Sequence, residues 1–435
     1  MKIAFLGAGA LRLLGVVDEV LKRREDFASP ALHFMDLDLL AAKLVSNLSA
    51  QMPSARGSGA TFTATDDLNA VLDGADFVYC CIRAGGVKGL ERDKRIASRY
   101  GYHGHDDFGP SAVMLTARTV PVMLEIARRM ERLCPRAWLL IFTNPITTLV
   151  DAVTRYTTIC SVGLCSGVYN FAYDMDHLYG VGVPCAGLRY RGGGLNHLSW
   201  VMPDATLNGR PVMDLIDETF NDLANRPGAE RCGWKRIAPL IRLYHAMFLN
   251  NGHQHHFFYH DELVCEMAEY FARTPDNAQR SNRQEQQRRD AAALLRGGTI
   301  DNFWQQPALV NCAAGPVGDI GAQFMAAIHS DTGAELAVNT PNAGHIVGIP
   351  DGAVVEAHAR IARGRIAPLH LDPIPDSLKG LCVAVAAHQR SLVDASVSQD
   401  RESLFRALLA EPTIRSFERA APMFDELWKA HQDAR

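Results

Sequence analysis

Two groups of residues have the types and the spacing to do chemistry. The first is a glycine turn, Gly7-Ala8-Gly9, followed further along by Asp36. Glycines in such a turn let the backbone approach a pyrophosphate, and an acidic side chain after the second strand accepts hydrogen bonds from a ribose diol. Arg12 replaces the third glycine of the usual pattern. The group predicts binding of NAD rather than NADP, because Asp36 would repel a 2′-phosphate. The alternative is a tight first turn that binds no nucleotide.

The second group is Cys165, which follows a strand-like run, and His197, which lies in a glycine-rich turn. Thiolate and imidazole are ligands for divalent metals, so the two side chains could hold one ion. Scattered Cys and His residues are usually structural, however, and spacing alone does not decide between the two interpretations. A further histidine-rich segment contains His253, His255, His256 and His260. That segment could be a metal cluster or a packed, hydrogen-bonded helix face.

Asp106 and Asp107 lie in a long loop between Arg83 and Pro110, within the run HGHDDFG. Carboxylates in such a loop can bind sugar hydroxyls or a cofactor, or they can stabilise a turn. A nucleotide site and a metal site on one chain together point to redox chemistry assisted by a Lewis acid.

The elements that must position these residues alternate between strand and helix over the first third of the chain. Apolar runs predict strands at Lys2–Leu6, Leu32–Asp36, Thr61–Ala64, Phe77–Ile82 and Trp138–Phe142. Helical patterns lie between them, at Leu11–Arg23, near Asp67–Leu72 and at Val113–Leu133. The alternation predicts an α/β fold with a Rossmann-like, doubly wound parallel sheet. Cys165 would then lie at the carboxyl edge of the sheet, where ligands bind in such folds.

Beyond about Gly180 the character changes, because helical stretches with Gly and Pro punctuation dominate. We therefore expect two domains, residues 1–190 and residues 191–435, of which the second is mixed α+β and mainly helical. The Arg/Gln-rich run Gln279–Arg296 is interpreted as a solvated helix face or an ordered surface loop.

The composition excludes several functional classes. Apolar residues make up 48% and charged residues 21% of the 435 positions, which is typical of a globular protein with a large core. A net charge of -4 gives no electrostatic case for nucleic acid or for an anionic membrane. No apolar run approaches the roughly 20 residues of a spanning helix. The chain runs directly into a strand and its ten Cys are scattered, so we expect no signal peptide, reduced thiols and a cytoplasmic location.

Taken together, the motifs resemble those of glycoside hydrolase family four, the NAD- and metal-dependent glycosidases. The long-loop pattern of that family, R-x-G-G and then D-E-R-I-P-x-K-Y-G-x-x-G-Q-E-T-x-G-P, is similar to the segment from Arg83 to Pro110. Its T-N-P and L-C-[ND] motifs match Thr143-Asn144-Pro145 and Leu164-Cys165-Ser166. The remaining matches are G-x-N-H-x-x-W at Gly194–Trp200 and two segments near the C-terminus, Asn339–Gly344 and Ile349–Glu356. The resemblance spans most of the chain.

The resemblance implies a fold like that of lactate and malate dehydrogenases. It implies an NAD-binding first domain and a second domain for catalysis and for assembly into a homodimer or homotetramer. NAD would transiently oxidise the sugar at C3, and a divalent metal, usually manganese, would be held by Cys165 and His197 and polarise the oxygens at C2 and C3. A tyrosine would remove the C2 proton, the aglycone would leave by elimination, and water would add.

Roles for individual residues follow from the same resemblance. Tyr259 is the expected base and Tyr244 its competitor, although Tyr259 could also be a core aromatic residue. Asp106 is the second expected catalytic residue. The expected cofactor-binding residues are Gly7, Gly9, Ala10, Asp36, Arg83 and Asn144. The expected substrate-binding residues are Asn144, His105, Asp106 and Arg92.

Departures from the family pattern bear on the substrate. Members that act on 6-phosphosugars tend to carry Ser and Arg where this chain has Ala10 and Leu90, although Arg92 could substitute. We therefore expect an unphosphorylated hexoside or uronide. Ser166 replaces the Asp or Asn that follows the metal cysteine, and serine is a poor general acid. The leaving-group proton must then come from another residue or from water, or the aglycone must leave easily. The run His105-Asp106-Asp107 replaces Q-E-T and predicts a remodelled sugar pocket.

Two other functions are compatible with parts of the sequence. A 2-hydroxy-acid dehydrogenase shares the strand-helix beginning, but it would leave Cys165 and His197 without a role. A catalytically inactive NAD-binding sensor is suggested by Ser166 and by the altered loop.

Overall fold

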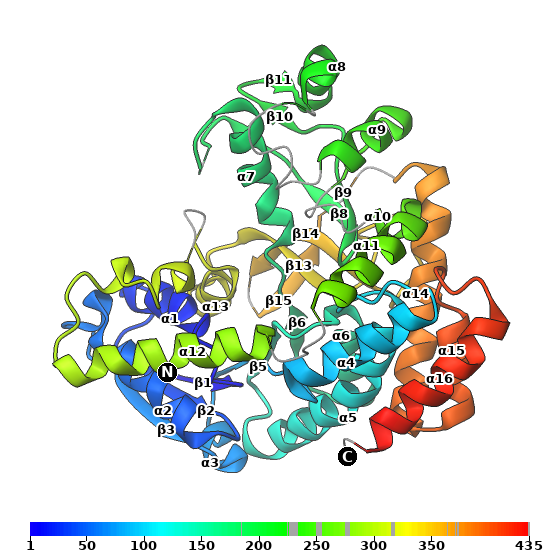
Figure 1. Ribbon diagram of the computed structural model, residues 1–435. Helices are drawn as coiled ribbons and strands as arrows, with labels where there is room; N and C mark the ends of the chain where they lie inside the picture. Colours follow the sequence, from blue (N-terminus) through cyan, green and yellow to red (C-terminus); the bar gives the residue numbers. More distant parts are fainter. Residues whose placement is uncertain are drawn as a thin grey trace.

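One large sheet forms the centre of the molecule, and helices pack against both of its faces (Figure 1). The computed structural model describes residues 1–183, 185–223, 225, 234–248, 255–274, 279–314, 318–362, 364–369, 371 and 374–433. Within these residues the large sheet has twelve strands, and a separate small sheet has three.

The first half of the large sheet is parallel. Its strands are β1 (Lys2–Leu6), β2 (Ala31–Met35), β3 (Thr61–Thr65), β4 (Phe77–Cys80), β5 (Trp138–Ile141) and β6 (Ser161–Gly163). They lie in the order β3-β2-β1-β4-β5-β6, which reverses direction between β1 and β4. Leu6 pairs with Met35 on one side and with Cys80 on the other, so the carboxyl ends of these strands share one edge. Ligands bind at such a reversal point, and the predicted Rossmann-like α/β fold is confirmed.

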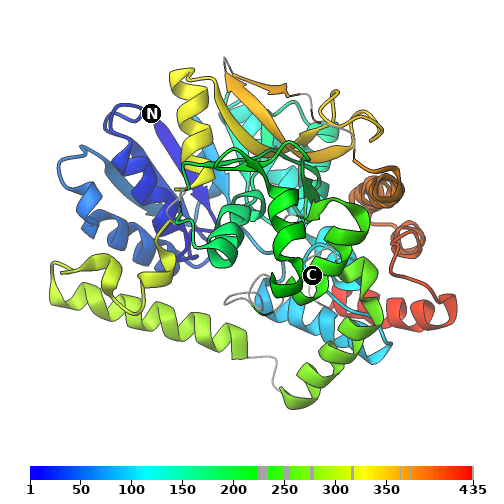
Figure 2. The same cartoon turned by 90° about the horizontal axis from the view of Figure 1, so that it is seen from above.

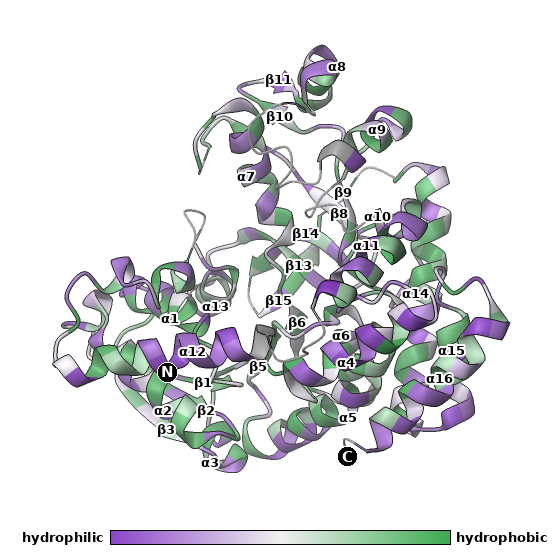
Figure 3. Cartoon of the chain, viewed as in Figure 1, coloured by the Kyte–Doolittle hydropathy of each residue, from purple (hydrophilic) through white to green (hydrophobic). Residues whose placement is uncertain are grey.

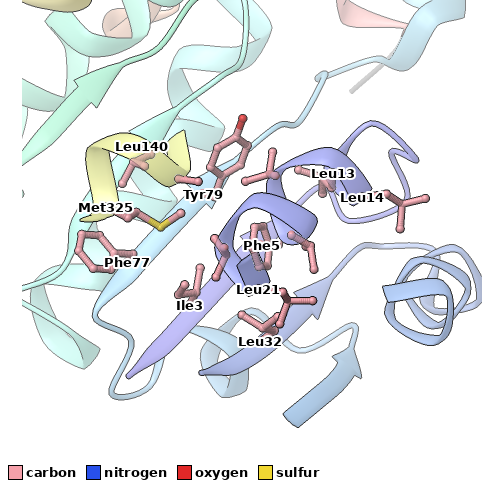
Figure 4. Close-up of a cluster of buried hydrophobic side chains, with 14 of the residues drawn as sticks. Ile3, Phe5, Leu13, Leu14, Leu21, Leu32, Phe77, Tyr79, Leu140 and Met325 are labelled. Carbon is pink, nitrogen blue, oxygen red and sulfur yellow. The ribbon is translucent and has the colours of Figure 1, made fainter. Parts of the chain in front are cut away.

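Helices cover both faces of the parallel half, as a doubly wound sheet requires. The helices of this region are α1 (Leu13–Lys22), α2 (Leu39–Gln51), α3 (Leu68–Leu72), α4 (Gly86–Arg99), α5 (Gly109–Leu133) and α6 (Ile146–Tyr156). Helices α1 and α2 pack on one face, and α3, α5 and α6 pack on the other. Figure 4 shows the first of these interfaces, where Phe5 lies among Leu21, Leu32 and Ile3. The rings of Phe5 and Phe34 are stacked with centroids 5.2 Å apart.

The second half continues the same sheet with antiparallel strands, which were not predicted from the sequence. These strands are β8 (Gly192–Leu195), β9 (Leu198–Val201), β12 (Met247–Phe248), β13 (Ala334–Pro341), β14 (Val354–Ala362) and β15 (Arg365–Pro368). β13 pairs with β6, and the order then runs β14, β8, β9 and β12. The small sheet consists of β7 (Leu188–Arg189), β10 (Thr206–Leu207) and β11 (Arg210–Pro211). The domain division at residue 190 stays a prediction, and the large sheet runs on through it.

The helices of the second half extend around the sheet, as the view from above shows (Figure 2). They are α7 (Gly167–Tyr179), α8 (Val212–Leu223), α9 (Trp234–Tyr244), α10 (His255–Phe258), α11 (His260–Arg273), α12 (Gln279–Leu294), α13 (Ile320–Ser330), α14 (Asp376–Ser398), α15 (Arg401–Leu409) and α16 (Phe417–Gln432). Short 3-10 helices are η1 (Pro53–Ala55), η2 (Leu295–Gly297), η3 (Phe303–Gln305) and η4 (Val310–Cys312). Among the described residues no helix is long and apolar enough to cross a membrane.

Candidate active site

A cleft of about 1570 Å³ opens at the carboxyl edge of the parallel strands. All eight residues predicted to bind the cofactor or the metal line it. These are Gly7, Gly9, Ala10, Asp36, Arg83, Asn144, Cys165 and His197. Among the described residues, four predicted for catalysis or substrate binding do not line the cleft: Arg92, His105, Asp106 and Tyr259. The fold thus brings the glycine turn and the Cys-His pair, which are far apart in the sequence, into one space.

The glycine turn is shaped by close packing against the strand beside it. Gly7 has a φ of +75°, and a Cβ atom there would lie 2.3 Å from the carbonyl oxygen of Cys81, so a side chain is excluded. Asp36 holds the turn from the other side, because its Oδ2 accepts a hydrogen bond of 2.8 Å from the Gly9 N–H. Its Oδ1 accepts a second bond from the Asp38 N–H at 3.0 Å. Asp36 therefore reaches the turn at the position predicted for a ribose-binding acid.

A network of charges lies in the loop beside the cleft. Asp106 is 13% exposed and is bridged by Arg83 Nη1 at 2.9 Å and by Lys94 Nζ at 3.1 Å. Burial alone would raise the pKa of Asp106, but the neighbouring cations of Lys94 and Arg83 outweigh burial and lower the pKa below its ordinary value. Asp106 is therefore a permanent carboxylate that orients Arg83 toward the cleft.

Cys165 and His197 face each other across the carboxyl edge of the sheet. Cys165 follows β6, and His197 lies in the tight turn between β8 and β9 with a φ of +61°. The Cys165 Sγ lies 3.8 Å from the His197 Nε2. Metal–sulfur and metal–nitrogen bonds of about 2.3 and 2.1 Å would place two ligands of one ion roughly 3 to 4 Å apart. The pair therefore fits a divalent metal.

The environment of His197 is anionic. Burial lowers the pKa of this imidazole, but the carboxylate of Asp107 and the thiol of Cys165 more than compensate and raise the pKa to about 10. Asp107 Oδ2 lies 3.5 Å from the same Nε2 and accepts a hydrogen bond from Asn144 Nδ2 at 3.1 Å. It also lies 3.4 Å from His105 Nδ1. In the residues that the structure describes, no group of three or more His, Cys, Asp or Glu side chains is drawn together as a closed metal cage.

Glu356 supports the turn that carries His197, a role that sequence reasoning missed although Glu356 ends the family-like segment Ile349–Glu356. Its carboxylate is buried on β14 and accepts hydrogen bonds from Asn196 Nδ2 at 2.9 Å and from Ser199 Oγ at 3.0 Å. Asn196 precedes His197 in the turn, and Ser199 follows it on β9. Burial raises the pKa of Glu356, against the opposing effects of His197 and the hydrogen bonds. Glu356 thus fixes the turn that aims the imidazole at Cys165.

Both halves of the chain match one family of known proteins. Residues 2–181 match the model of the family 4 glycosyl hydrolases, and residues 193–414 match the model of the family 4 glycosyl hydrolase C-terminal domain. The chain belongs to the family 4 glycosyl hydrolases. This confirms the resemblance that the motifs carry.

Individual family 4 relatives are distant but match over most of their length. The probable 6-phospho-beta-glucosidase of Bacillus subtilis (strain 168) is 26% identical over 99% of this chain and 96% of its own. An alpha-galactosidase of the same strain is 25% identical over 85% of this chain and 83% of its own. The alpha-galacturonidase of Thermoanaerobacter italicus is 24% identical over 98% of this chain and 96% of its own. The relatives thus include enzymes named for phosphorylated and for unphosphorylated sugars.

Solved structures show the same fold. A 6-phospho-alpha-glucosidase from gut microorganisms, in complex with NAD and glucose-6-phosphate, superposes with a TM-score of 0.87 at 20% identity over 100% of this chain and 98% of that chain. The 6-phospho-beta glucosidase of Thermotoga maritima, with manganese, NAD+ and glucose-6-phosphate, superposes with a TM-score of 0.83. It is 19% identical, and the match covers 100% of this chain and 99% of that chain. A lactate dehydrogenase of Cryptosporidium parvum superposes with a TM-score of 0.53 at 14% identity, over 90% of this chain and 98% of that chain. This agrees with the predicted dehydrogenase-like fold.

The tyrosine expected as the base in this family 4 chain lies beside the loop rather than in the cleft. Tyr259 is half-buried, immediately precedes α11 and packs against the apolar cluster of the second half, and Tyr244 lies against Phe258 in the same cluster. The preceding segment contacts the loop, because the ring of His256 lies 4.8 Å from that of His105. The predicted role of Tyr259 stays a prediction.

The histidine-rich segment is packed in the part that the structure describes. His256 and His260 are both buried, and His260 lies against the ring of Tyr102. His253 lies outside the described residues, as does the side chain of His255. Packing of His256 and His260 therefore agrees with the alternative of a helix face rather than a metal cluster.

One wall of the cleft was missed by sequence reasoning. The run Gln279–Arg296 is interpreted above as a solvated helix face or a surface loop, and most of α12 is indeed exposed. Three of its side chains, however, line the cleft at Gln284, Gln287 and Arg288. Because α12 is polar on all sides, its sequence contains no apolar stripe that could have indicated a buried face.

Proposed function

We propose that this protein is an NAD- and manganese-dependent glycosidase that acts on an unphosphorylated hexoside or uronide. The observation that carries the proposal is the shared cleft, into which both the glycine turn and the pair of Cys165 and His197 open. A dinucleotide with its pyrophosphate at the turn would extend along the cleft toward that pair, so a sugar beside the metal ligands would lie next to the cofactor's reactive end.

The residues fit both groups. The turn offers backbone N–H donors and no side chain at Gly7, and the Sγ–Nε2 distance of 3.8 Å suits one divalent ion. When bound, NAD supplies reversible hydride acceptance from the sugar C3–H, and the metal supplies Lewis acidity at the oxygens on C2 and C3.

The chain's own residues then divide the remaining work. Tyr259 takes the proton from C2, which is acidic only while C3 is a carbonyl. A phenol acts as a base only after it has lost its own proton, so Tyr259 needs a cation beside it for this step. Asp106 stays ionised between Lys94 and Arg83 and positions Arg83, which lines the cleft. Asn144 donates to Asp107 and thereby keeps this second carboxylate beside His197.

The preference for an unphosphorylated sugar rests on three positions. Ala10 lines the cleft and carries no hydroxyl. Leu90 is fully buried, so its position cannot present a donor to a sugar phosphate. Arg92 contacts the buried carboxylate of Asp93 at 3.3 Å, which Arg118 also binds. A phosphate would therefore find no free guanidinium among these three positions.

The leaving group is the second point of substrate preference. Ser166 lines the cleft and is exposed, and a serine hydroxyl does not donate a proton near neutral pH. We expect glycosides with acidic aglycones, such as nitrophenol, to be hydrolysed much faster than alkyl glycosides of the same sugar.

A glycoside panel tests the proposed function. The panel would contain α- and β-glycosides, free and 6-phosphorylated, assayed under reducing conditions with NAD and Mn²⁺ each supplied or omitted. We expect hydrolysis of an unphosphorylated glycoside that requires both additions and leaves no net NADH. Preference for a phosphorylated sugar would overturn the substrate assignment. Hydrolysis without either addition, or net NADH without released aglycone, would overturn the reaction.

A further inference from the structure

Helix α12 lies across the nucleotide end of the cleft, although apolar residues that could hold it there occur only near its C-terminal end. It crosses in front of β1 in Figure 1 and is coloured as hydrophilic along most of its length in Figure 3. Its outer side is stabilised by pairs one turn apart, Arg289 with Glu285 and Gln286 with Asp290. A helix that is polar all round needs polar partners on its inner side as well.

The inner side of α12 is held by a few specific contacts. Ala291 is fully buried in the first apolar cluster and anchors the C-terminal turn of the helix. Gln287 Nε2 donates to the carbonyl oxygen of Ala308 at 2.9 Å. Arg288 Nε donates to the carbonyl oxygen of Gly9 at 3.0 Å, which ties the helix directly to the glycine turn.

This contact fixes where the rest of the guanidinium lies. A Cβ atom on Gly9 would lie 3.1 Å from Arg288 Nη2 and 3.0 Å from Asp36 Oδ2, so the cation and the carboxylate both lie close to the same glycine. Among the described residues, Arg288 makes its hydrogen bond with the Gly9 carbonyl oxygen, through Nε. Arg288 lines the cleft, so the donors of its two Nη groups are available to a ligand there.

We propose that Arg288 binds the pyrophosphate of the dinucleotide, so that α12 is part of the cofactor site. A planar guanidinium with several donors matches phosphate oxygens in a bidentate way, and it adds a positive charge to the one that Arg12 brings to the glycine turn. Asp36, which also lies close to Gly9, would accept hydrogen bonds from the ribose, so the two side chains would recognise adjacent parts of the same ligand. The inference rests on the proposed binding of NAD at this turn.

Binding measurements on the full chain test the inference without relying on activity. Dissociation constants for NAD, ADP and adenosine would be measured by calorimetry for the wild type, Arg288→Gln and Arg289→Gln. The glutamine at 288 can still donate to the Gly9 carbonyl but lacks the charge. Arg289 lies next to it on the same helix and faces Glu285 in solvent, so its variant is the matched control.

The expected result separates the two phosphates from the nucleoside. Arg288→Gln should weaken the binding of NAD and of ADP by about 10- to 100-fold, because a charge-assisted contact is lost. The affinity for adenosine should stay unchanged. Arg289→Gln should change none of the three. Equal affinity of wild type and Arg288→Gln for NAD, or an equal loss for adenosine, would overturn the inference. Failure of the wild type itself to bind NAD would instead overturn the proposed function.

Discussion

The proposed nucleotide turn and the proposed metal pair, Cys165 and His197, lie in one cleft but are built in opposite ways. The turn needs only backbone shape, and its parts come from the ends of adjacent parallel strands within the first 36 residues of the chain. The metal pair depends on side chains that converge from separate segments, with Cys165 after β6, His197 between β8 and β9, and Glu356 on β14. A local motif can therefore be recognised from its spacing, whereas a converged site depends on the whole sheet.

Replacing Cys165, the proposed metal ligand, should have the largest effect, because it should greatly reduce activity without changing the affinity for NAD. Cys165→Ser removes the soft ligand, so we expect a loss of glycosidase activity of about 10³-fold, which corresponds to several kcal/mol of Lewis-acid stabilisation. NAD affinity, measured by calorimetry, should stay within about twofold. The exposed Cys160 gives the control, because Cys160→Ser leaves the cleft untouched. Activity of Cys165→Ser close to that of Cys160→Ser would show that the pair holds no catalytic metal.

The opposite change affects the backbone of the turn. Gly7→Ala forces a Cβ atom to within 2.3 Å of the Cys81 carbonyl oxygen at a φ of +75°, so we expect the free energy of unfolding to fall by about 2 to 5 kcal/mol. Gly74 has a φ of +65°, and a Cβ atom there would meet nothing within 4 Å, so Gly74→Ala should cost only about 1 to 2 kcal/mol. Denaturant titrations measure both. Equal losses would mean that the turn tolerates a side chain.

The sequence predicts the local motifs of the fold and the site, but not the residues that only tertiary packing brings together. The glycine turn, Asp36 and the parallel strands were predicted, because each depends on a local period or on a short motif. The antiparallel half of the sheet was not, since Gly192–Leu195 contains three glycines and does not alternate like a strand. Asp107 and Glu356 were not expected beside His197, because only tertiary packing joins them. The inner side of α12 was missed for the same reason.

The support beneath His197 should matter less than the ligand itself. Glu356→Gln replaces an acceptor with a donor between Asn196 and Ser199, which loosens the turn. We expect Mn²⁺ affinity, measured by electron paramagnetic resonance of the free ion, to fall by about 10- to 100-fold. Glu335→Gln, at an exposed position on the same sheet, should have no effect. Unchanged Mn²⁺ affinity in Glu356→Gln would remove Glu356 from the account of the site.

A smaller effect should appear far from both sites. His388 in α14 is buried, and burial lowers its pKa to about 4 even though its Nδ1 lies 2.9 Å from the Ala407 carbonyl oxygen. Between pH 6.5 and 4 the unfolded chain binds a proton there that the folded chain does not, so stability falls as the pH falls. At pH 5 this amounts to about 2 kcal/mol. The amide of the His388→Asn variant can still donate a hydrogen bond to the same carbonyl oxygen. In this variant the urea concentration at the unfolding midpoint should depend less on pH than in the wild type. An unchanged slope would exclude His388 as its source.

The most direct test of the central claim, that the two sites act in one elimination reaction, is hydrolysis in D₂O with NAD and Mn²⁺ supplied. If a base of the protein removes the C2 proton while C3 is oxidised, the released sugar should carry one deuterium at C2, seen by mass spectrometry and by loss of the C2 proton signal in NMR. A released sugar without deuterium at C2 would contradict the account, because direct displacement at the anomeric carbon never breaks the C2–H bond.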